Sequence, residues 1–208
     1  MDENLLEIAH ASKGFMPDEE GLALYEAGLV AGQRGPLLEI GSYCGKSAIF
    51  LGAAAKETSS TLFSVDHHRG SEENQPGEEF HDPDLLDEEG RVDTLPWFRS
   101  TIDEAALSGW VVGVVGASTV VARSWSTPLA LVFIDGGHST AAARADYESW
   151  APKLMSDGLL AIHDVYPDPA DGGRPPFEIF ARALESNAFE EVTVCGSLRV
   201  LRKVGEDI

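Results

Sequence analysis

Two short stretches of the chain carry side chains that can bind a metal ion and move a proton. Asp135 closes the apolar run at 129–135. His163 and Asp164 close a second apolar run at 159–164. If the two runs are neighbouring parallel strands, their carboxyl ends lie side by side, at the crevice where such sheets bind ligands. Carboxylate and imidazole groups would then converge, and such groups bind hard or borderline divalent ions.

A third stretch, at 37–56, reads LLEIGSYCGKSAIFLGAAAK and places a glycine turn before a Gly-Lys-Ser triplet. A phosphate-binding loop has Gly, four residues and then Gly-Lys-Ser/Thr. Here only three residues separate Gly41 from the next glycine, so the loop is one residue too short to wrap a phosphate. The acidic Glu39 before the loop would also repel a triphosphate. The spacing argues against a nucleotide hydrolase, and we interpret Lys46 as an ordinary first-turn helix residue.

The same stretch fits a nucleoside cofactor that has no phosphates. Gly41 and Gly45 let the backbone approach a ligand closely, and Glu39 suits a cationic one. S-adenosylmethionine is such a ligand, with sulfonium, ammonium, ribose and adenine groups. In doubly wound α/β folds that bind nucleoside cofactors, an acidic residue at the end of the second strand binds the ribose hydroxyls. Asp66 closes the run at 61–66, about 25 residues after the loop, and is the candidate for that role.

The elements that must position these residues alternate along the chain. Nearly continuous apolar runs, typical of parallel strands covered on both faces, lie at 37–40, 61–66, 111–116, 129–135 and 159–164. Helical patterns lie at 3–33, 46–56, 94–107, 118–124, 139–154 and 175–187. The runs FEEVTVCG and SLRVLRKV, joined at Gly196-Ser197, predict an antiparallel pair.

We therefore predict one α/β domain over residues 1–208. Its Rossmann-like, doubly wound sheet has seven strands, five of them parallel, with a C-terminal antiparallel hairpin and helices on both faces. Residues 1–34 form an N-terminal helical segment. The polar, acidic segment at 67–93 interrupts the alternation, and a loop this long is either functional or disordered. Because it leaves the carboxyl end of the second strand, we expect a lid that orders over a ligand.

Composition excludes several classes of partner. The net charge is −20, whereas nucleic acids and anionic membrane surfaces attract basic proteins. No apolar run reaches the length of about 18 residues that a membrane span needs, and the acidic N-terminus is unlike a signal peptide. Cys44 and Cys195 form no metal-binding or redox pair, as in a reducing compartment. We expect a cytoplasmic protein with no nucleic-acid or membrane partner. We also expect a homodimer, because the N-terminal segment lies outside the core pattern.

Four motifs together carry a family resemblance. LLEIGSYCGKSA resembles the first motif of the class I S-adenosylmethionine-dependent methyltransferases, and looks closest to the metal-dependent catechol O-methyltransferase type. That type has a glutamate before the loop and a Tyr-Cys-Gly turn within it. GAST at 116–119, LVFIDGGH at 131–138 and LLAIHDV at 159–165 resemble its later segments, in the family's order. The resemblance implies O-methyl transfer from S-adenosyl-L-methionine to a small-molecule hydroxyl acceptor.

The resemblance also implies site residues. The methionine end of the cofactor would be lined by Glu39, Gly41, Ser42 and Tyr43. Asp66 would bind the ribose, and Ala117 and Ser118 would contact the adenine. By position, the predicted cofactor set also includes Gly45, Ser47, His67 and Asp135. The alternatives are structural, with Ser118 as a helix N-cap and Asp66 as a turn residue.

Catechol-type enzymes place Mg²⁺ on two aspartates and an asparagine, at positions that here hold Asp135, His163 and Asp164. Imidazole is a poorer Mg²⁺ ligand than carboxylate. The resemblance implies Mg²⁺. The histidine leaves two alternatives, a set that favours Mn²⁺ or another transition ion, or a His163 that points elsewhere while water fills the shell. The resemblance further implies that His138 is the general base, in a position where the family often has lysine. The structural alternative is that His138 caps the next helix.

The acceptor does not follow from the motifs. The segments that would cover the site are acidic, rich in histidine and short of aromatic residues, which favours a sugar or saccharide hydroxyl. A phenolic or polyketide hydroxyl is the alternative, and a protein that binds S-adenosylmethionine without catalysis also remains open. Candidate acceptor contacts are His68, Arg69, His81, Tyr166 and Arg174.

Overall fold

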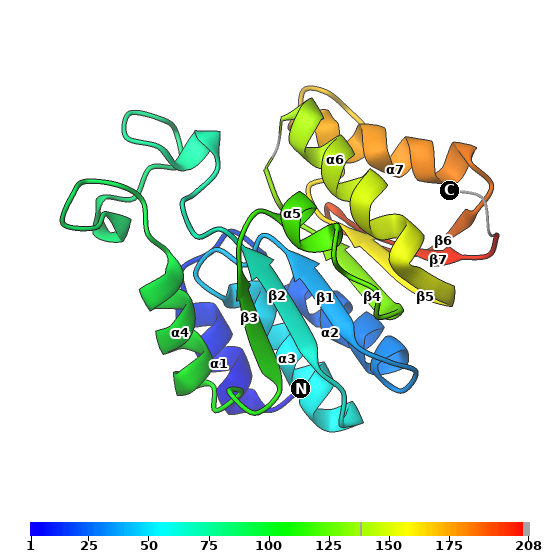
Figure 1. Ribbon diagram of the computed structural model, residues 1–208, viewed down its shortest axis with the longest axis horizontal. Coiled ribbons are helices and arrows are strands. Elements are labelled where there is room, and N and C mark those ends of the chain that lie inside the picture. The colour runs from blue at the N-terminus through cyan, green and yellow to red at the C-terminus, as the bar shows by residue number, and fades with distance from the viewer. Residues whose placement is uncertain (138, 206–208) are drawn as a thin grey trace.

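The computed structural model describes residues 1–137 and 139–205. Within them, seven strands form one sheet in the order β3-β2-β1-β4-β5-β7-β6 (Figure 1). The strands are β1 (Leu37–Ile40), β2 (Leu62–Asp66), β3 (Val111–Val115), β4 (Leu129–Ile134), β5 (Leu154–Ile162), β6 (Phe189–Cys195) and β7 (Leu198–Lys203). The first five are parallel, and the hairpin of β6 and β7 adds to β5 in antiparallel fashion. The predicted seven-stranded sheet is confirmed.

Helices cover both faces of the sheet (Figure 1). One layer holds α1 (Glu3–Ala11), α2 (Asp18–Gly32), α3 (Lys46–Thr58) and α4 (Leu95–Glu104). The other holds α5 (Ser118–Ala122), α6 (Thr140–Trp150) and α7 (Pro175–Glu185). Short 3-10 turns are η1 (Glu72–Asn74), η2 (Pro83–Leu85) and η3 (Ala151–Lys153). None of the helices in the described part of the chain has the length and hydropathy of a membrane span.

The apolar runs reflect burial on both sides of the sheet. Every residue of β1 and β4 is buried. One apolar cluster lies under α1 to α4 and includes Phe50 and Leu107, and a second lies under α5 to α7 and includes Tyr147 and Trp150. Because each central strand faces a helix layer on either side, its side chains are apolar without alternation.

The N-terminal helices belong to the same core. Leu24 of α2 is fully buried, and α2 packs so closely on α3 that a Cβ at Gly21 would lie 2.3 Å from the ring of Phe50. The expectation that this segment lies outside the core was therefore wrong, because its apolar face is buried within its own domain. The packing removes the reason for placing a second subunit there, and the homodimer stays a prediction.

Several predicted boundaries differ. The helical region expected at 3–33 is two helices, α1 and α2, and the largest shift lies between α6 and β5. The helix expected at 139–154 ends at Trp150, and β5 begins at Leu154, five positions before the predicted strand. Pro152 accounts for the early end, since proline has no N–H for the helix ladder. The carboxyl end of β5, which bears the candidate ligands, is where the sequence predicted it.

Candidate functional site

The loop between β1 and α3 is shaped by two glycines. Gly41 has φ +87°, and a Cβ there would lie 2.1 Å from the carbonyl oxygen of Asp135. Gly45 has φ +94° and is the N-cap of α3. Glycine at position 41 therefore lets the ends of β1 and β4 meet, which brings the loop beside Asp135.

Asp66, at the end of β2, holds this loop. Its Oδ2 accepts hydrogen bonds from the main-chain N–H groups of Ser42 (3.0 Å) and Tyr43 (2.9 Å). Its Oδ1 accepts from the main-chain N–H of His68 at 2.7 Å. The carboxylate thus joins the glycine loop to the start of the lid-like segment. The bond from His68, two residues later, is the turn role that the sequence offered as the alternative for Asp66, whereas the bonds to the glycine loop were not predicted.

Glu39 lies beneath the loop and is fully buried. Ser47 Oγ donates to Oε2 at 2.9 Å, and the hydroxyl of Ser64 donates to Oε1. Burial raises the pKa of Glu39 to about 7, the negative charges of Asp135 and Asp66 add to the rise, and the two serine hydrogen bonds oppose it. The group is therefore poised to ionise when a cation approaches.

The predicted nucleoside cofactor fits the loop. Ser42 is buried, and its Oγ has no hydrogen-bond partner among the described residues. A buried hydroxyl without a partner is costly and is explained where a ligand completes it. Asp66 uses three amide hydrogen bonds, whereas an ionised carboxylate has about four acceptor sites, which leaves capacity for a ribose hydroxyl.

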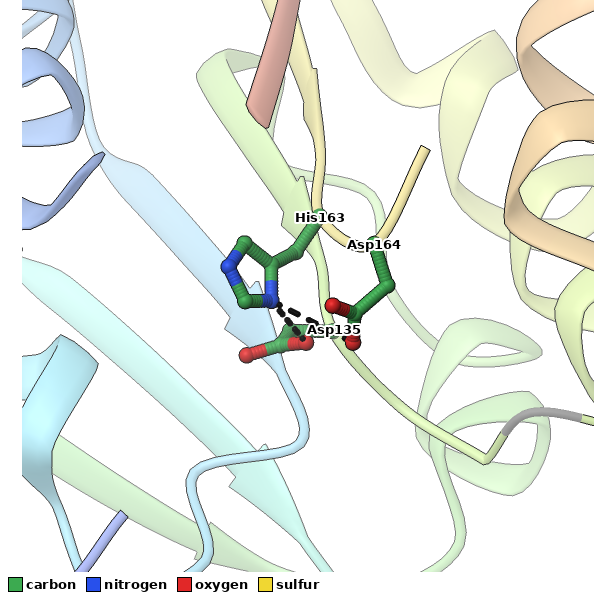
Figure 2. Close-up of side chains that lie close together, drawn as sticks. All are labelled: Asp135, His163 and Asp164. Carbon is green, nitrogen blue, oxygen red and sulfur yellow. Dashed lines mark hydrogen bonds and ion pairs between the residues drawn. The ribbon is translucent and has the colours of Figure 1, made fainter. Parts of the chain in front are cut away.

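At the ends of β4 and β5, Asp135, His163 and Asp164 converge (Figure 2). His163 Nδ1 lies 3.1 Å from Oδ1 of Asp135 and 3.4 Å from Oδ2 of Asp164. The aspartates are partly exposed, whereas His163 is buried. Asp164 has φ +56°, in the left-handed region that Asp enters more readily than most residues. The predicted convergence of these three side chains is confirmed.

A fourth side chain completes this cluster from the opposite side. Glu20, on α2, accepts a hydrogen bond from His163 Nε2 at 2.5 Å. Burial lowers the pKa of His163, but the three carboxylates of Asp135, Asp164 and Glu20 outweigh it and raise that pKa. Burial raises the pKa of Glu20, and the hydrogen bonds from His163 and Ser197 more than offset this. The imidazole is thus held between acidic groups at both nitrogens.

The cluster fits a divalent ion. One donor atom from each of Asp135, His163 and Asp164 lies within 4.8 Å of the others. Neighbouring ligands of an ion with bonds of about 2.1 Å lie about 3 Å apart, close to the two Nδ1-to-carboxylate distances. A carboxylate on the far nitrogen of a histidine is also what orients metal-ligating imidazoles in other sites.

The predicted adenine contacts lie at the start of α5. Ala117 is the N-cap of that helix. Ser118 is its first residue, and its hydroxyl donates to Oδ1 of Asp146, a buried residue of α6. Burial raises the pKa of Asp146, and the Ser118 hydrogen bond opposes the rise. His67 is exposed at the end of β2, where its Nδ1 accepts from the main-chain N–H of Arg69 at 3.0 Å.

The segment at 67–93 is anchored at two places. Leu85 and Val92 are buried against Cys44 of the glycine loop. Lys13, between α1 and α2, forms ion pairs with Asp82 at 2.5 Å and Asp84 at 3.0 Å. The segment is therefore packed beside the predicted cofactor loop. The linker at 12–17, between α1 and α2, lies against the same segment and forms one wall of the surface next to the loop.

Three aromatic rings from separate segments meet at this wall. The ring of Phe15, in the N-terminal linker, lies 5.6 Å from that of Tyr43 and 5.2 Å from that of Phe80. Phe15 and Phe80 are 62% and 41% exposed. Exposed rings gathered at one place mark a surface that can receive a ligand.

The predicted acceptor contacts are dispersed. His68 is buried, its Nδ1 lies 2.8 Å from Thr94 Oγ1, and its Nε2 has no hydrogen-bond partner among the described residues. Arg69 donates to Asp87 at 3.1 Å, and His81 Nδ1 lies 3.2 Å from the carbonyl oxygen of Asn74, both within the 67–93 segment.

The loop after β5 holds the other two predicted acceptor contacts. Tyr166 OH donates to Asp164 Oδ1 at 3.2 Å, which places this ring next to the metal-type cluster. Arg174 donates to the carbonyl oxygens of Tyr166 and Pro167 and lies over the ring of Phe177. Arg174 therefore links the two ends of the loop at 166–174. His138, the predicted base, lies outside the described residues.

Sequence reasoning missed four residues that the fold brings to the site: Glu20, Asp146, Phe15 and Lys13. Glu20 lies in the acidic first turn of a helix, where a carboxylate needs no further explanation. Asp146 is one of several polar residues on α6. The one available signal was Phe15, a large aromatic residue in a short polar linker.

Comparison with known proteins places this geometry in context. A family model described as a methyltransferase domain matches residues 38–165. Similar folds include the O-methyltransferase TomG from Streptomyces achromogenes, involved in tomaymycin synthesis and solved in complex with SAM. It has 14% identity and a TM-score of 0.66, with 99% of this chain and 91% of that chain covered.

Two further structures resemble the chain. An O-methyltransferase from Bacillus cereus in complex with SAH has 15% identity and a TM-score of 0.67, with 99% and 92% of the two chains covered. The SAH-bound methyltransferase PaMTH1 from Podospora anserina has 13% identity and a TM-score of 0.65, with 99% and 89% covered. At these identities the likeness shows a shared fold.

Proposed function

The chain belongs to the methyltransferase domain family, and on that premise we propose that it transfers a methyl group from S-adenosyl-L-methionine to a hydroxyl of a small polar acceptor. One observation supports this most strongly. The loop that Asp66 organises packs against Asp135 through Gly41, and Asp135 belongs to the cluster with His163 and Asp164. A cofactor at the loop and a hydroxyl at the cluster would therefore be neighbours.

We assign the methionine end of the cofactor to the β1–α3 loop. The hydroxyl of Ser42, which has no partner among the described residues, would gain one there, and the carboxyl of Glu39 would complement the positive charge of the ligand. Asp66 would accept from the ribose hydroxyls. At the other end of the cofactor, Ala117 and Ser118 would contact the adenine, with Ser118 oriented by Asp146.

Asp135, His163 and Asp164 would hold a divalent ion, which when bound lowers the pKa of a hydroxyl that coordinates it. The imidazole nitrogen favours Mn²⁺ over Mg²⁺. Tyr166, bonded to Asp164, would form a wall of the acceptor site. These residues would fix the acceptor oxygen in line with the methyl carbon and sulfur of the cofactor, which is the main catalytic contribution that positioning can supply.

We assign the base to His138 from its sequence position, three residues after Asp135. Histidine is a common general base because its ordinary titration range includes neutral pH, and a neutral imidazole at this position would accept the hydroxyl proton. The oxygen forms a bond to the methyl carbon while the carbon–sulfur bond breaks. That electron pair stays on sulfur, so the products are the methyl ether and S-adenosylhomocysteine.

For the acceptor we propose a sugar or saccharide hydroxyl. The 67–93 segment beside the cofactor loop supplies carboxylates, histidines and amides, including His81 and Asn74. Many hydrogen bonds from such groups suit a polar, flexible acceptor. A phenolic hydroxyl is the second candidate, because the rings of Phe15, Tyr43 and Phe80 meet at this wall and flat acceptors stack on such rings.

The test uses methyl-labelled S-adenosylmethionine with matched panels of sugar and phenolic hydroxyls, in Mn²⁺ and in EDTA. We expect transfer that requires the ion and falls about 100-fold or more in His138→Ala. The control His10→Ala removes an exposed imidazole on α1 that pairs with Asp18.

Full activity of His138→Ala in EDTA would overturn the metal and base assignments. Failure to bind S-adenosylmethionine by calorimetry would overturn the function, and binding without transfer to any acceptor would indicate a non-catalytic protein.

A further inference from the structure

Glu20 stands apart from the predicted site residues because it comes from the N-terminal helix α2 and reaches a strand end 143 residues away. Its side chain is 6% exposed. Its Oε2 lies 2.5 Å from Nε2 of His163, while Nδ1 of the same ring faces Asp135 and Asp164. Figure 2 shows this division of the ring, with one nitrogen turned to the two aspartates and the other turned away from them.

We propose that Glu20 is a positioning residue of the metal site, which accepts the Nε2–H of His163 and so presents the Nδ1 lone pair to a divalent ion. This inference rests on the metal site of the proposed function. A neutral imidazole carries one N–H, and an ionised carboxylate is an acceptor only. In the metal-free protein Asp135 and Asp164 attract a proton to Nδ1 as well. When an ion takes the place of that proton, the ring keeps the Nε2–H that Glu20 accepts, and this hydrogen bond orients Nδ1 toward the ion.

The surroundings of Glu20 hold its carboxylate in this orientation. The main-chain N–H of Ser197 donates to Oε1 at 2.6 Å, and the Ser197 hydroxyl donates to Oε2 at 3.1 Å. Gly196, beside it in the β6–β7 turn, also fits closely against Glu20, since a Cβ there would lie 2.0 Å from Oε1. Both oxygens are thus fixed by the hairpin turn, so Oε2 keeps its place opposite Nε2.

The decisive variant is Glu20→Gln, which keeps the size of the side chain. Its amide has one oxygen and one NH₂ group. If the oxygen accepts from Ser197, the NH₂ faces Nε2 and selects the tautomer with the proton on Nδ1, which blocks ligation. A matched control is Glu57→Gln, because Glu57 on α3 accepts a 2.7 Å hydrogen bond from Tyr25 on α2, the helix that carries Glu20. That control perturbs the attachment of α2 without touching the cluster.

The experiment titrates metal-free protein with Mn²⁺ alone, by calorimetry and by electron paramagnetic resonance, and measures S-adenosylmethionine affinity in parallel. We expect Mn²⁺ affinity to fall 10- to 100-fold in Glu20→Gln, with cofactor affinity within about threefold of the wild type. We expect both affinities to be unchanged in Glu57→Gln. Equal Mn²⁺ affinity in wild type and Glu20→Gln would overturn the role of Glu20 and leave the metal site standing. No Mn²⁺ binding by the wild type would overturn both.

A second measurement needs no variant and so remains decisive if Glu20→Gln does not fold. In ¹⁵N-histidine wild-type protein loaded with Zn²⁺, we expect the resonances of His163 to show a proton on Nε2 and the metal on Nδ1. Ligation at Nδ1 by itself puts the proton on Nε2, so the readout specific to Glu20 is that proton, which we expect to be shifted downfield and slow to exchange with solvent because Glu20 accepts it. Ligation through Nε2, or an unligated His163, would overturn the proposal.

Discussion

The main-chain N–H of Ser42 donates a 3.0 Å hydrogen bond to Oδ2 of Asp66, so the end of β2 fixes the loop that follows β1. In Asp66→Asn, an NH₂ group replaces one carboxylate oxygen and faces main-chain N–H groups, which need an acceptor. We expect the Kd for S-adenosylmethionine to rise tenfold or more, and the free energy of unfolding to fall by about 1–3 kcal/mol. Calorimetry and urea unfolding measure the two effects.

Asp103→Asn is the control for this change, because Asp103 accepts from Ser108 on the exposed side of α4. It should leave cofactor affinity unaltered. An Asp66→Asn protein that binds the cofactor like the wild type would contradict the role of Asp66.

Glu39 should make stability depend on pH. Burial raises its pKa from an ordinary 4.5 to about 7, so between these values the native state holds a proton that the unfolded chain has released. The free energy of unfolding should therefore decrease as pH rises from about 4.5 to about 7, by up to about 1.4 kcal/mol per pH unit. Urea unfolding at pH 5, 6, 7 and 8 measures the slope. Glu39→Gln should lack this part of the slope, and identical slopes in both proteins would refute the assignment.

Gly41→Ala should be among the most damaging single changes in the chain. The new Cβ would lie 2.1 Å from the Asp135 carbonyl oxygen, at φ +87°. Gly77→Ala is a matched control, since Gly77 has φ +96° and a Cβ added there would meet nothing within 4 Å. We expect about 1 kcal/mol of destabilisation at Gly77 from the backbone, and at least about 3 kcal/mol, with loss of cofactor binding, at Gly41. Similar losses at both positions would show that the contact with Asp135 is unimportant.

Lys13 should restrain the 67–93 segment. Lys13→Met removes the ion pairs with Asp82 and Asp84, and such partly exposed pairs contribute less than about 1 kcal/mol to global stability. We therefore expect little change in unfolding but faster amide exchange across 82–86, read by mass spectrometry. Arg91→Gln, which removes ion pairs internal to the segment, is the control. Unchanged exchange in Lys13→Met would contradict the restraint.

Lys46→Ala separates the cofactor assignment from a nucleotide-binding one. Lys46 is the first residue of α3. Its ammonium lies 3.9 Å from the carboxylate of Asp18, at the outer limit of an ion pair, and the two side chains are 13% and 40% exposed. We expect S-adenosylmethionine affinity to change by less than about threefold, because such pairs are worth at most about 1 kcal/mol. ATP binding that is present in the wild type and abolished in Lys46→Ala would instead favour a phosphate-binding loop.

The sequence by itself determined the sheet and the residue types that meet at its edge. Apolar runs without alternation indicated strands buried on both faces, and parallel strands end at one edge. That was enough to predict that Asp135, His163 and Asp164 lie together. The start of β5 was predicted too late because Ser156, Asp157 and Gly158 lie in its first half. Such residues are typical of loops, so the local pattern indicated a loop there.

Only the tertiary structure decided how these residues are held. Glu20 looks like an ordinary first-turn carboxylate in the sequence, and its contact with His163 spans 143 positions. For Asp66 the sequence left a ribose ligand and a turn residue as alternatives, and only the packing of β2 against the glycine loop shows that Oδ2 also accepts the amides of Ser42 and Tyr43. Periodicity and spacing report which face of an element is buried and where a strand ends. The partner of a buried polar atom depends on how separate elements pack, and that is fixed when the whole core forms.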